Sequence, residues 1–146
     1  MKQLAPSILS ADFICLGEQL KQLQKLCIHY LHIDVMDGMF VPSISFGMPV
    51  IASLRKHTDM FFDVHLMIEE PIRYVNALRQ AGADGLTVHA EACADLPGTI
   101  AAIRESGAKP AVCLSPKTPL SKLDGDRKST RLNSSHNRES RMPSSA

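Results

Sequence analysis

Apolar residues follow two patterns along this chain, short runs with a period of two and longer stretches with a period of three to four. The short runs predict strands at residues 4–9, 30–36, 60–68, 85–90 and 109–114. The longer stretches predict helices at residues 12–26, 49–56, 71–81 and 96–105, and Pro119 is placed to begin a fifth. Strands and helices therefore alternate, with about 25 to 30 residues between successive strands.

Local signals support these boundaries. Asp12 is placed to cap the first helix or to sit in its first turn, where an acid is favourable. Asp37-Gly38 marks a turn after the second strand, and Pro49 and Pro71 suit first helical turns. Gly82 follows the third helix as a candidate C-terminal cap.

This alternation predicts an α/β fold with a parallel sheet and right-handed crossovers. Two architectures fit, an open doubly wound sheet and a (β/α)8 TIM barrel. The first strand-to-helix turn has no GxGxxG, and GxxxxGK[ST] is absent from the sequence, so the usual nucleotide-binding loops are missing. A whole barrel needs about 200–250 residues. Residues 1–125 could supply only about half of such a barrel, and both architectures stay open at this point.

The composition of the chain is that of one ordinary globular domain. It has 146 residues, of which 45% are hydrophobic and 21% charged, and its formal net charge is +1. This balance does not favour nucleic acid or a membrane surface as a partner. No apolar run approaches the roughly 18 residues that cross a bilayer, and the first residues lack the pattern of a signal peptide. A cytoplasmic location is the default expectation.

Residues 126–146 differ sharply from what precedes them. They hold six Ser, five Lys or Arg and two acidic residues, with no Val, Ile, Phe or Tyr, so residues 1–125 keep 11 basic and 13 acidic residues, a net charge of −2. Such a segment cannot bury enough apolar surface to offset chain entropy. We expect a disordered, non-native extension; a basic arm that contacts nucleic acid is the alternative.

The four cysteines do not predict a structural metal site. Cys15, Cys27, Cys93 and Cys113 are separated by 12, 66 and 20 residues, so none forms a CxxC pair. We interpret them as free, buried thiols in a reducing compartment.

The candidate chemistry lies on two successive strands. Because side chains alternate between the faces of a strand, one face carries polar or softer residues on both: His32, Asp34 and Met36 on the second strand, Asp63, His65 and Met67 on the third. The carboxyl ends of parallel strands are where α/β proteins build their sites. Two imidazoles and a carboxylate predict a metal site with nitrogen and oxygen ligands. A structural polar network is the alternative.

Several segments resemble the ribulose-phosphate 3-epimerase family. They are APSILSAD, LHIDVMDGMFVP, FFDVHLMIEEP, AGADGLTVHAEA and CLSPKTPL, and together they extend over about residues 3–123 in order. HIDVMDG followed by DVHLM about thirty residues later is the most specific pair. The resemblance implies a (β/α)8 TIM barrel that binds a sugar phosphate. Residues 1–125 would then form a partial barrel, truncated to about its first five strands.

The resemblance also implies roles for individual residues. His32, Asp34 and His65 would bind a divalent metal, typically zinc, with iron, manganese or cobalt as alternatives. Asp34 would be the general base, and Ser10 and His65 would contact the substrate. Met36 and Met67 would line the reacting carbon. The role of His89, which faces inward with Thr87, stays open between pocket lining and structure.

The implied reaction is conversion of D-ribulose 5-phosphate to D-xylulose 5-phosphate. An epimerase for a hexulose phosphate, such as allulose 6-phosphate, is an alternative. A non-catalytic half-barrel that associates with itself is another, because it would have exposed sheet edges. In the family, a second catalytic aspartate (also a metal ligand) and the phosphate site come from later strands, and full-length members are expected to be homo-oligomers. Nothing after Leu123 supplies these parts, so we expect this chain alone to be inactive.

Overall fold

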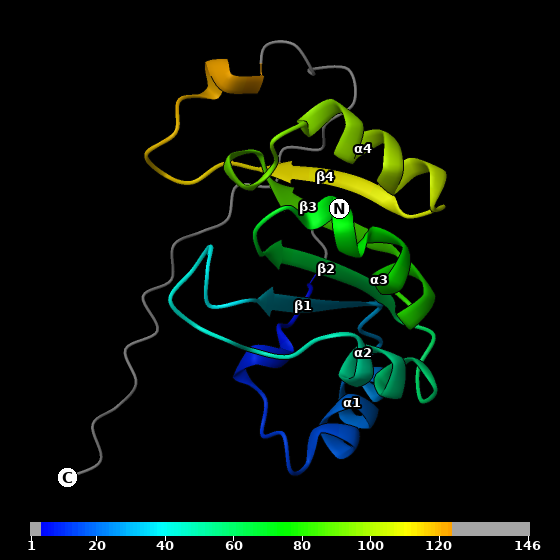
Figure 1. Cartoon of the computed structure of the whole chain (residues 1–146). Coiled ribbons are helices and arrows are strands. Elements are labelled where there is room, and N and C mark those ends of the chain that lie inside the picture. Colours follow the sequence, from blue (N-terminus) through cyan, green and yellow to red (C-terminus); the bar gives the residue numbers. More distant parts are fainter. Residues whose placement is uncertain (1–3, 124–146) are drawn as a thin grey trace, which may run out of the picture.

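The computed structural model describes residues 4–123, and Figure 1 shows the arrangement of their elements. The expected tail at residues 126–146 lies outside the described residues. Four strands form one sheet: β1 (Tyr30–Met36), β2 (Phe61–Met67), β3 (Gly85–His89) and β4 (Lys109–Cys113). Four α-helices precede or connect them: α1 (Leu16–Lys25), α2 (Met48–Arg55), α3 (Val75–Ala81) and α4 (Leu96–Glu105).

The strands lie side by side in chain order, and each pairs in parallel with the next. Right-handed crossovers between neighbours in that order place successive helices on the same face of the sheet (Figure 1). An open doubly wound sheet would instead reverse its strand order at a switch point. Among the described residues no such reversal occurs. The predicted α/β class with a parallel sheet is confirmed.

The predicted strand at residues 4–9 is wrong. Only Ser7 pairs there, through an isolated parallel bridge to His32, whose amide donates to the carbonyl of Pro6 at 2.9 Å. A 3-10 turn, Ile8–Ser10, follows at once. The hydroxyl of Ser7 accepts a hydrogen bond from the amide of Leu9, which turns the chain away from the extended conformation. Pro6 also has no amide proton to continue a ladder.

Three helix predictions also differ from the structure, two at the start of the helix and one in the type of helix. The helix expected from residue 12 begins at Leu16, because Asp12 instead accepts the amide of Ile14 in a preceding turn. The helix expected from residue 71 opens with a 3-10 segment, Pro71–Tyr74, before α3. A 3-10 segment, Leu120–Leu123, stands where Pro119 was expected to begin a fifth helix.

The core lies between the sheet and the helices. Alternate strand residues point into it, and Leu31, Ile33, Phe62, Val64 and Leu86 are completely buried. Each such side chain contributes about 1.5–3 kcal/mol through removal of apolar surface from water. The residues between them occupy the opposite face, which leaves that face for polar chemistry.

Carboxylates join the loops at the carboxyl ends of the strands. Oδ2 of Asp37, after β1, accepts the amide of Glu69, after β2, at 2.8 Å. Glu70 in turn accepts the amide of Ala94 at 3.0 Å, in the segment after β3. Glu91 accepts the amide of Ser115, after β4, at 2.8 Å. Each loop is therefore bonded to the next one along the edge that carries the site.

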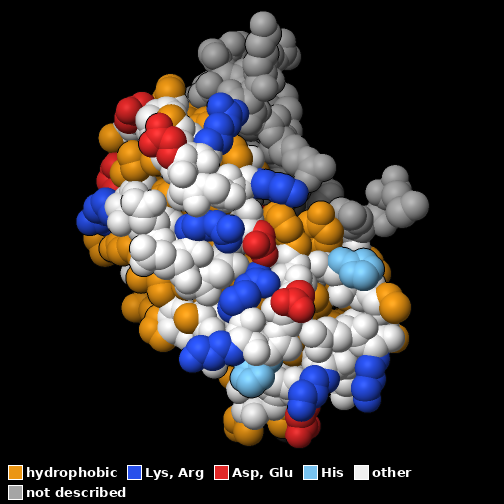
Figure 2. Space-filling model, turned by 90° about the vertical axis from the view of Figure 1, so that its right-hand side faces the viewer, with side chains coloured by type: hydrophobic (Ala, Val, Ile, Leu, Met, Phe, Trp, Pro, Cys, Tyr) orange, Lys and Arg blue, Asp and Glu red, His pale blue; other side chains and the backbone are white. Residues whose placement is uncertain are grey.

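The opposite edge carries mixed charge. Each α-helix has a basic residue in its last turn: Lys25, Arg55, Arg79 and Arg104. A cation there is favourable because it faces the negative end of the helix dipole. Figure 2 shows Lys and Arg interspersed with Asp and Glu on this side, so the face in view has no field of a single sign. None of the described helices is both long and apolar enough to cross a membrane.

Gly82 ends α3 in a conformation that needs glycine. Its φ is +117°, and an added Cβ would lie 2.8 Å from Cγ of Arg55, whose guanidinium donates to Gly82 O at 2.9 Å and to Asp84 Oδ2 at 2.7 Å. We predict that Gly82→Ala lowers the free energy of unfolding by about 1–3 kcal/mol, because it strains the backbone and displaces Arg55. Urea unfolding followed by circular dichroism measures this.

Gly17 provides the matched control. It lies in α1 with no atom within 4 Å of an added Cβ and with no positive φ. Gly17→Ala is expected to stabilise the chain by about 0.5–1 kcal/mol through helix propensity. Equal effects of the two substitutions would contradict the role assigned to Gly82.

Candidate functional site

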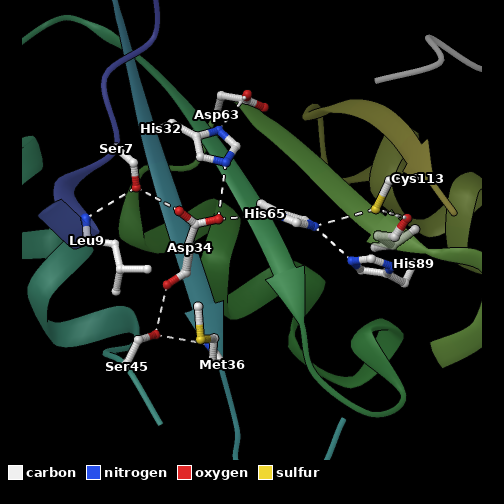
Figure 3. Close-up of polar contacts among 11 residues, drawn as sticks. Ser7, Leu9, His32, Asp34, Met36, Ser45, Asp63, His65, His89 and Cys113 are labelled. Carbon is white, nitrogen blue, oxygen red and sulfur yellow. Dashed lines mark hydrogen bonds and ion pairs between the residues drawn. The ribbon is translucent and has the colours of Figure 1, made fainter. Parts of the chain in front are cut away.

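The polar face of the sheet brings the predicted residues together on β1 and β2. In the parallel register His32 pairs with Asp63 and Asp34 pairs with His65. Figure 3 shows the carboxylate of Asp34 between the two imidazoles. Atoms of His32, Asp34 and His65 that are able to ligate a metal all lie within 4.8 Å of one another.

Asp34 is the centre of this cluster. Its Oδ1 lies 3.2 Å from Nε2 of His32 and 3.1 Å from Nδ1 of His65. Its Oδ2 accepts a hydrogen bond from the hydroxyl of Ser7 at 2.6 Å. On the far side of His32, Nδ1 lies 3.0 Å from Oδ2 of Asp63. The backbone of Asp34 is held as well, since its carbonyl accepts the hydroxyl of Ser45 at 2.8 Å.

These contacts shift the protonation of the cluster. Burial alone would lower the pKa of His32, but hydrogen bonds to Asp34 and Asp63 raise it to about 9. Burial would raise the pKa of Asp34, yet hydrogen bonds from His32, His65 and Ser7 hold that pKa well below its usual range. The ion-free cluster therefore keeps a proton on His32 between two carboxylates. A bound cation would supply the same positive charge.

The other predicted site residues differ in where they lie relative to the cluster around Asp34. Met36 and Met67 are paired in register at the ends of β1 and β2, and both are half-buried. Ser10 is exposed in the 3-10 turn, and its amide donates to the carbonyl of Ser7. The structure does not bring Ser10 to the cluster around Asp34.

Two contributors escaped the sequence analysis. Ser7 reaches Asp34 from the segment that was predicted to be a strand. Nothing in the sequence distinguishes Ser7 from the nearby Ser10 as a candidate site residue. Asp63 was placed on the polar face but received no role. Its position opposite His32 in the register is the signal that would have identified it.

His89, whose role was open, is buried on the same face. Its Nε2 lies 3.0 Å from Nε2 of His65, and its ring centroid lies 4.9 Å from that of Phe40. Cys113 is also buried there, with Sγ 3.4 Å from Nε2 of His65. The polar face is thus continuous across all four strands.

A cavity of about 620 Å³ lies elsewhere, between α1 and α2. It is lined mainly by apolar side chains, among them Phe13, Leu20 and Phe46. Ser45 also lines it, but His32, Asp34 and His65 do not. This cavity does not contain the cluster of His32, Asp34 and His65. We place the candidate site at that cluster because its nitrogen and oxygen donor atoms converge there.

Comparison with known proteins identifies what the chain resembles. A family model described as the ribulose-phosphate 3-epimerase family matches residues 3–126. Ribulose-phosphate 3-epimerase of Bacillus subtilis (strain 168) is 52% identical over 124 residues, which cover 85% of this chain and 57% of that protein. The protein of the same name from Rhodobacter capsulatus is 44% identical over 122 residues, 84% of this chain and 54% of that one. The cytoplasmic isoform of rice is 43% identical over 122 residues, 83% and 54% of the two chains.

The chain thus spans about half the length of the curated relatives it matches. Among solved structures, that of 7,8-dihydropteroate synthase from Vibrio fischeri ES114 superposes with a TM-score of 0.51 at 13% identity. The alignment covers 90% of this chain and 57% of that one. At this identity the likeness concerns the fold alone.

The electrostatics of the cluster predict how His32 titrates. Because its pKa is raised to about 9 in the folded chain from 6.5, its interaction with the carboxylates stabilises the fold fully below pH 6.5. That stabilisation is lost as the pH rises through 9. Asp63→Asn removes one carboxylate partner and should lower the pKa of His32. NMR titration of the imidazole in chelator-treated protein measures this.

Asp59→Asn is the control, since Asp59 is an exposed carboxylate in the loop before β2. It should leave the titration of His32 unchanged. A titration midpoint of His32 below pH 6.5 in the chelator-treated wild-type chain would contradict the claim that Asp34 and Asp63 raise the pKa of His32.

Proposed function

The chain belongs to the ribulose-phosphate 3-epimerase family, and on that premise we propose that it provides the metal ligands and the first general base for C3 epimerisation of D-ribulose 5-phosphate to D-xylulose 5-phosphate. The observation that carries this proposal is the carboxylate of Asp34 set between two imidazoles at 3.1 and 3.2 Å. A base adjacent to a cation site is the arrangement that proton removal next to a carbonyl requires.

His32, Asp34 and His65 would hold a divalent cation. The donor set of two nitrogens and a carboxylate fits zinc, and iron, manganese or cobalt as alternatives. The carboxylates of Asp34 and Asp63 on either side of His32 support this fit, because two neighbouring anionic groups favour positive charge there. When bound, the cation would supply Lewis-acid stabilisation of the negative charge that develops on the substrate oxygens.

Asp34 would take the proton from C3. Its lowered pKa keeps it ionised at neutral pH, so the carboxylate is present in its accepting form. A carboxylate of low pKa is also a weak base, which is why the charge on the substrate must be stabilised as the proton leaves. Ser7 would orient the carboxylate, since its hydroxyl donates to Oδ2.

The remaining contacts to the sugar phosphate stay predictions. Met36 and Met67, paired at the carboxyl ends of their strands, would provide an apolar lining over the reacting carbon. His65 would contact the substrate beside the metal. Ser10 would have to contact the sugar from the exposed 3-10 turn in which it lies.

Inversion needs a second acid that returns a proton to the opposite face of the carbon. Among residues 4–123 we assign no residue to that role or to a phosphate site. Hexulose phosphates such as allulose 6-phosphate would undergo the same proton removal, so both substrates belong in any assay. From membership of the family we also propose that the full-length protein forms a homo-oligomer and supplies the remaining substrate contacts.

The metal site predicts selective loss of ion binding. Manganese is a useful probe because carboxylate and imidazole ligands suit it better than thiolate does. We expect Asp34→Asn to weaken Mn²⁺ binding by about 100-fold or more, since an anionic ligand is lost. Electron paramagnetic resonance of free Mn²⁺ measures the affinity. Asp59→Asn should bind as the wild type does, and equal affinities in all three proteins would exclude Asp34 as a ligand.

The catalytic role is testable in a chimera. Residues 3–126 of this chain would replace the matching part of the Bacillus subtilis relative, which supplies the rest of a barrel. We expect the chimera to form xylulose 5-phosphate in a coupled assay. Asp34→Asn should lower kcat by about 100-fold to 10,000-fold, the range for loss of a general base. Turnover that survives this substitution would reject Asp34 as the base.

Self-association is the second candidate, favoured by the sheet edges. β4 pairs only with β3, so no other described strand pairs with the backbone groups on its outer edge, and such an edge favours pairing with a strand of another chain. Sedimentation velocity separates the two: a concentration-dependent dimer of the 146-residue chain supports edge pairing, and a monomer at all concentrations argues against it.

A further inference from the structure

A second cluster of metal-ligating side chains adjoins the first. His65, His89 and Cys113 come from β2, β3 and β4 and lie next to one another on the polar face (Figure 3). Their exposed fractions are 7%, 7% and 2%. One nitrogen or sulfur atom from each lies within 4.8 Å of the other two. The proposed epimerase function uses neither His89 nor Cys113.

The spacing of these atoms is close to that of a tetrahedral ion site. Nε2 of His65 lies 3.0 Å from Nε2 of His89 and 3.4 Å from Sγ of Cys113. Zinc bonds of about 2.0–2.1 Å to nitrogen and 2.3 Å to sulfur give tetrahedral edges of roughly 3.3 Å and 3.6 Å. The donor atoms of His89 and Cys113 would each need to move only a few tenths of an ångström away from Nε2 of His65.

The other nitrogen of each imidazole faces a carboxylate. Nδ1 of His65 lies 3.1 Å from Oδ1 of Asp34, and Nδ1 of His89 lies 3.6 Å from Oε2 of Glu91. Both atoms of the second pair are buried and have no hydrogen-bond partner, so a small rotation that joined them would satisfy both. Metal-ligating histidines nearly always donate their second ring N–H to such an acceptor, which keeps the lone pair on the ligating nitrogen.

The protonation of these groups is compatible with an ion. Burial and the neighbouring His65 lower the pKa of His89, which keeps that imidazole neutral and able to ligate. Burial raises the pKa of the Cys113 thiol to about 12, so the thiol keeps its proton when no ion is bound. Binding would break the S–H bond, form a sulfur–metal bond and release the proton to solvent.

We propose that His65, His89 and Cys113 form a binding site for a thiophilic transition-metal ion of the zinc class, with two nitrogens and one sulfur as ligands. The site is softer than the cluster of His32, Asp34 and His65, and it shares His65 with that cluster. A neutral imidazole has one lone pair. An ion held by Nε2 of His65 therefore leaves Nδ1 protonated toward Asp34, and the two sites compete for this residue.

Cobalt(II) tests the site, because a cobalt–thiolate bond produces a charge-transfer absorption band that nitrogen and oxygen ligands do not. Reduced wild-type chain titrated anaerobically with Co²⁺ should develop this band at about one ion per chain. Cys113→Val, which replaces the thiol by an apolar side chain suited to a strand, should lose it. Cys27→Ser is the matched control, since Cys27 is the exposed thiol. It should keep the band.

No band in the wild type, or a band that persists in Cys113→Val, would overturn the proposal. A measurement that needs no change at Cys113 covers the case in which Cys113→Val does not fold. X-ray absorption of the zinc-loaded variant Cys15→Ser/Cys27→Ser/Cys93→Ser should show one sulfur neighbour at about 2.3 Å. A shell of nitrogen and oxygen alone would also overturn it.

The proposal does not depend on the epimerase function. Asparagine at position 34 still presents an oxygen to Nδ1 of His65, so Asp34→Asn should retain the cobalt–thiolate band while it loses Mn²⁺ binding. A wild-type chain that binds Mn²⁺ but shows no cobalt–thiolate band would contradict the site at Cys113 and leave the site at Asp34 in place. A wild-type chain that shows the band but does not bind Mn²⁺ would contradict the site at Asp34 alone.

Discussion

The parallel register between β1 and β2 is the constraint on which the rest of this site depends. It pairs Asp34 with His65 and His32 with Asp63, on the face opposite the helices. Because side chains alternate along a strand, a slip of one residue would turn Asp34 into the apolar core and Ile33 toward the polar face. Ile33 is completely buried, so the packing of the core and the geometry of the site enforce the same register.

His65 connects the two halves of the polar face. Its Nδ1 faces Asp34 and its Nε2 faces His89, so one ring couples β1 to β3. The carboxylate bonds between successive loops, from Asp37 to Glu69 and onward, hold the strand ends that carry these side chains. Removing a buried polar partner here would leave its neighbour unsatisfied, which is why such a network tolerates little change.

Much of the architecture follows from patterns that are local in the chain. The strand at residues 30–36 forms with the predicted bounds because apolar and polar residues alternate within it. The helix at residues 96–105 also has the predicted bounds, because the side chain of Asp95 caps its first turn. The first strand failed for an equally local reason that was overlooked. Ser7 accepts the amide of Leu9 and bends the chain after a single bridge.

The sequence by itself determined which side chains share a face. A period of two placed His32 with Asp34 and Asp63 with His65 before any strand was paired. Only the tertiary structure decided which of these groups touch and through which atoms. Ser7 reaches Asp34 across 27 residues, and Cys113 reaches His65 across 48. Such contacts depend on strand order, register and ring orientation, which are set when the helices pack against the sheet and are not encoded in the period of any one segment.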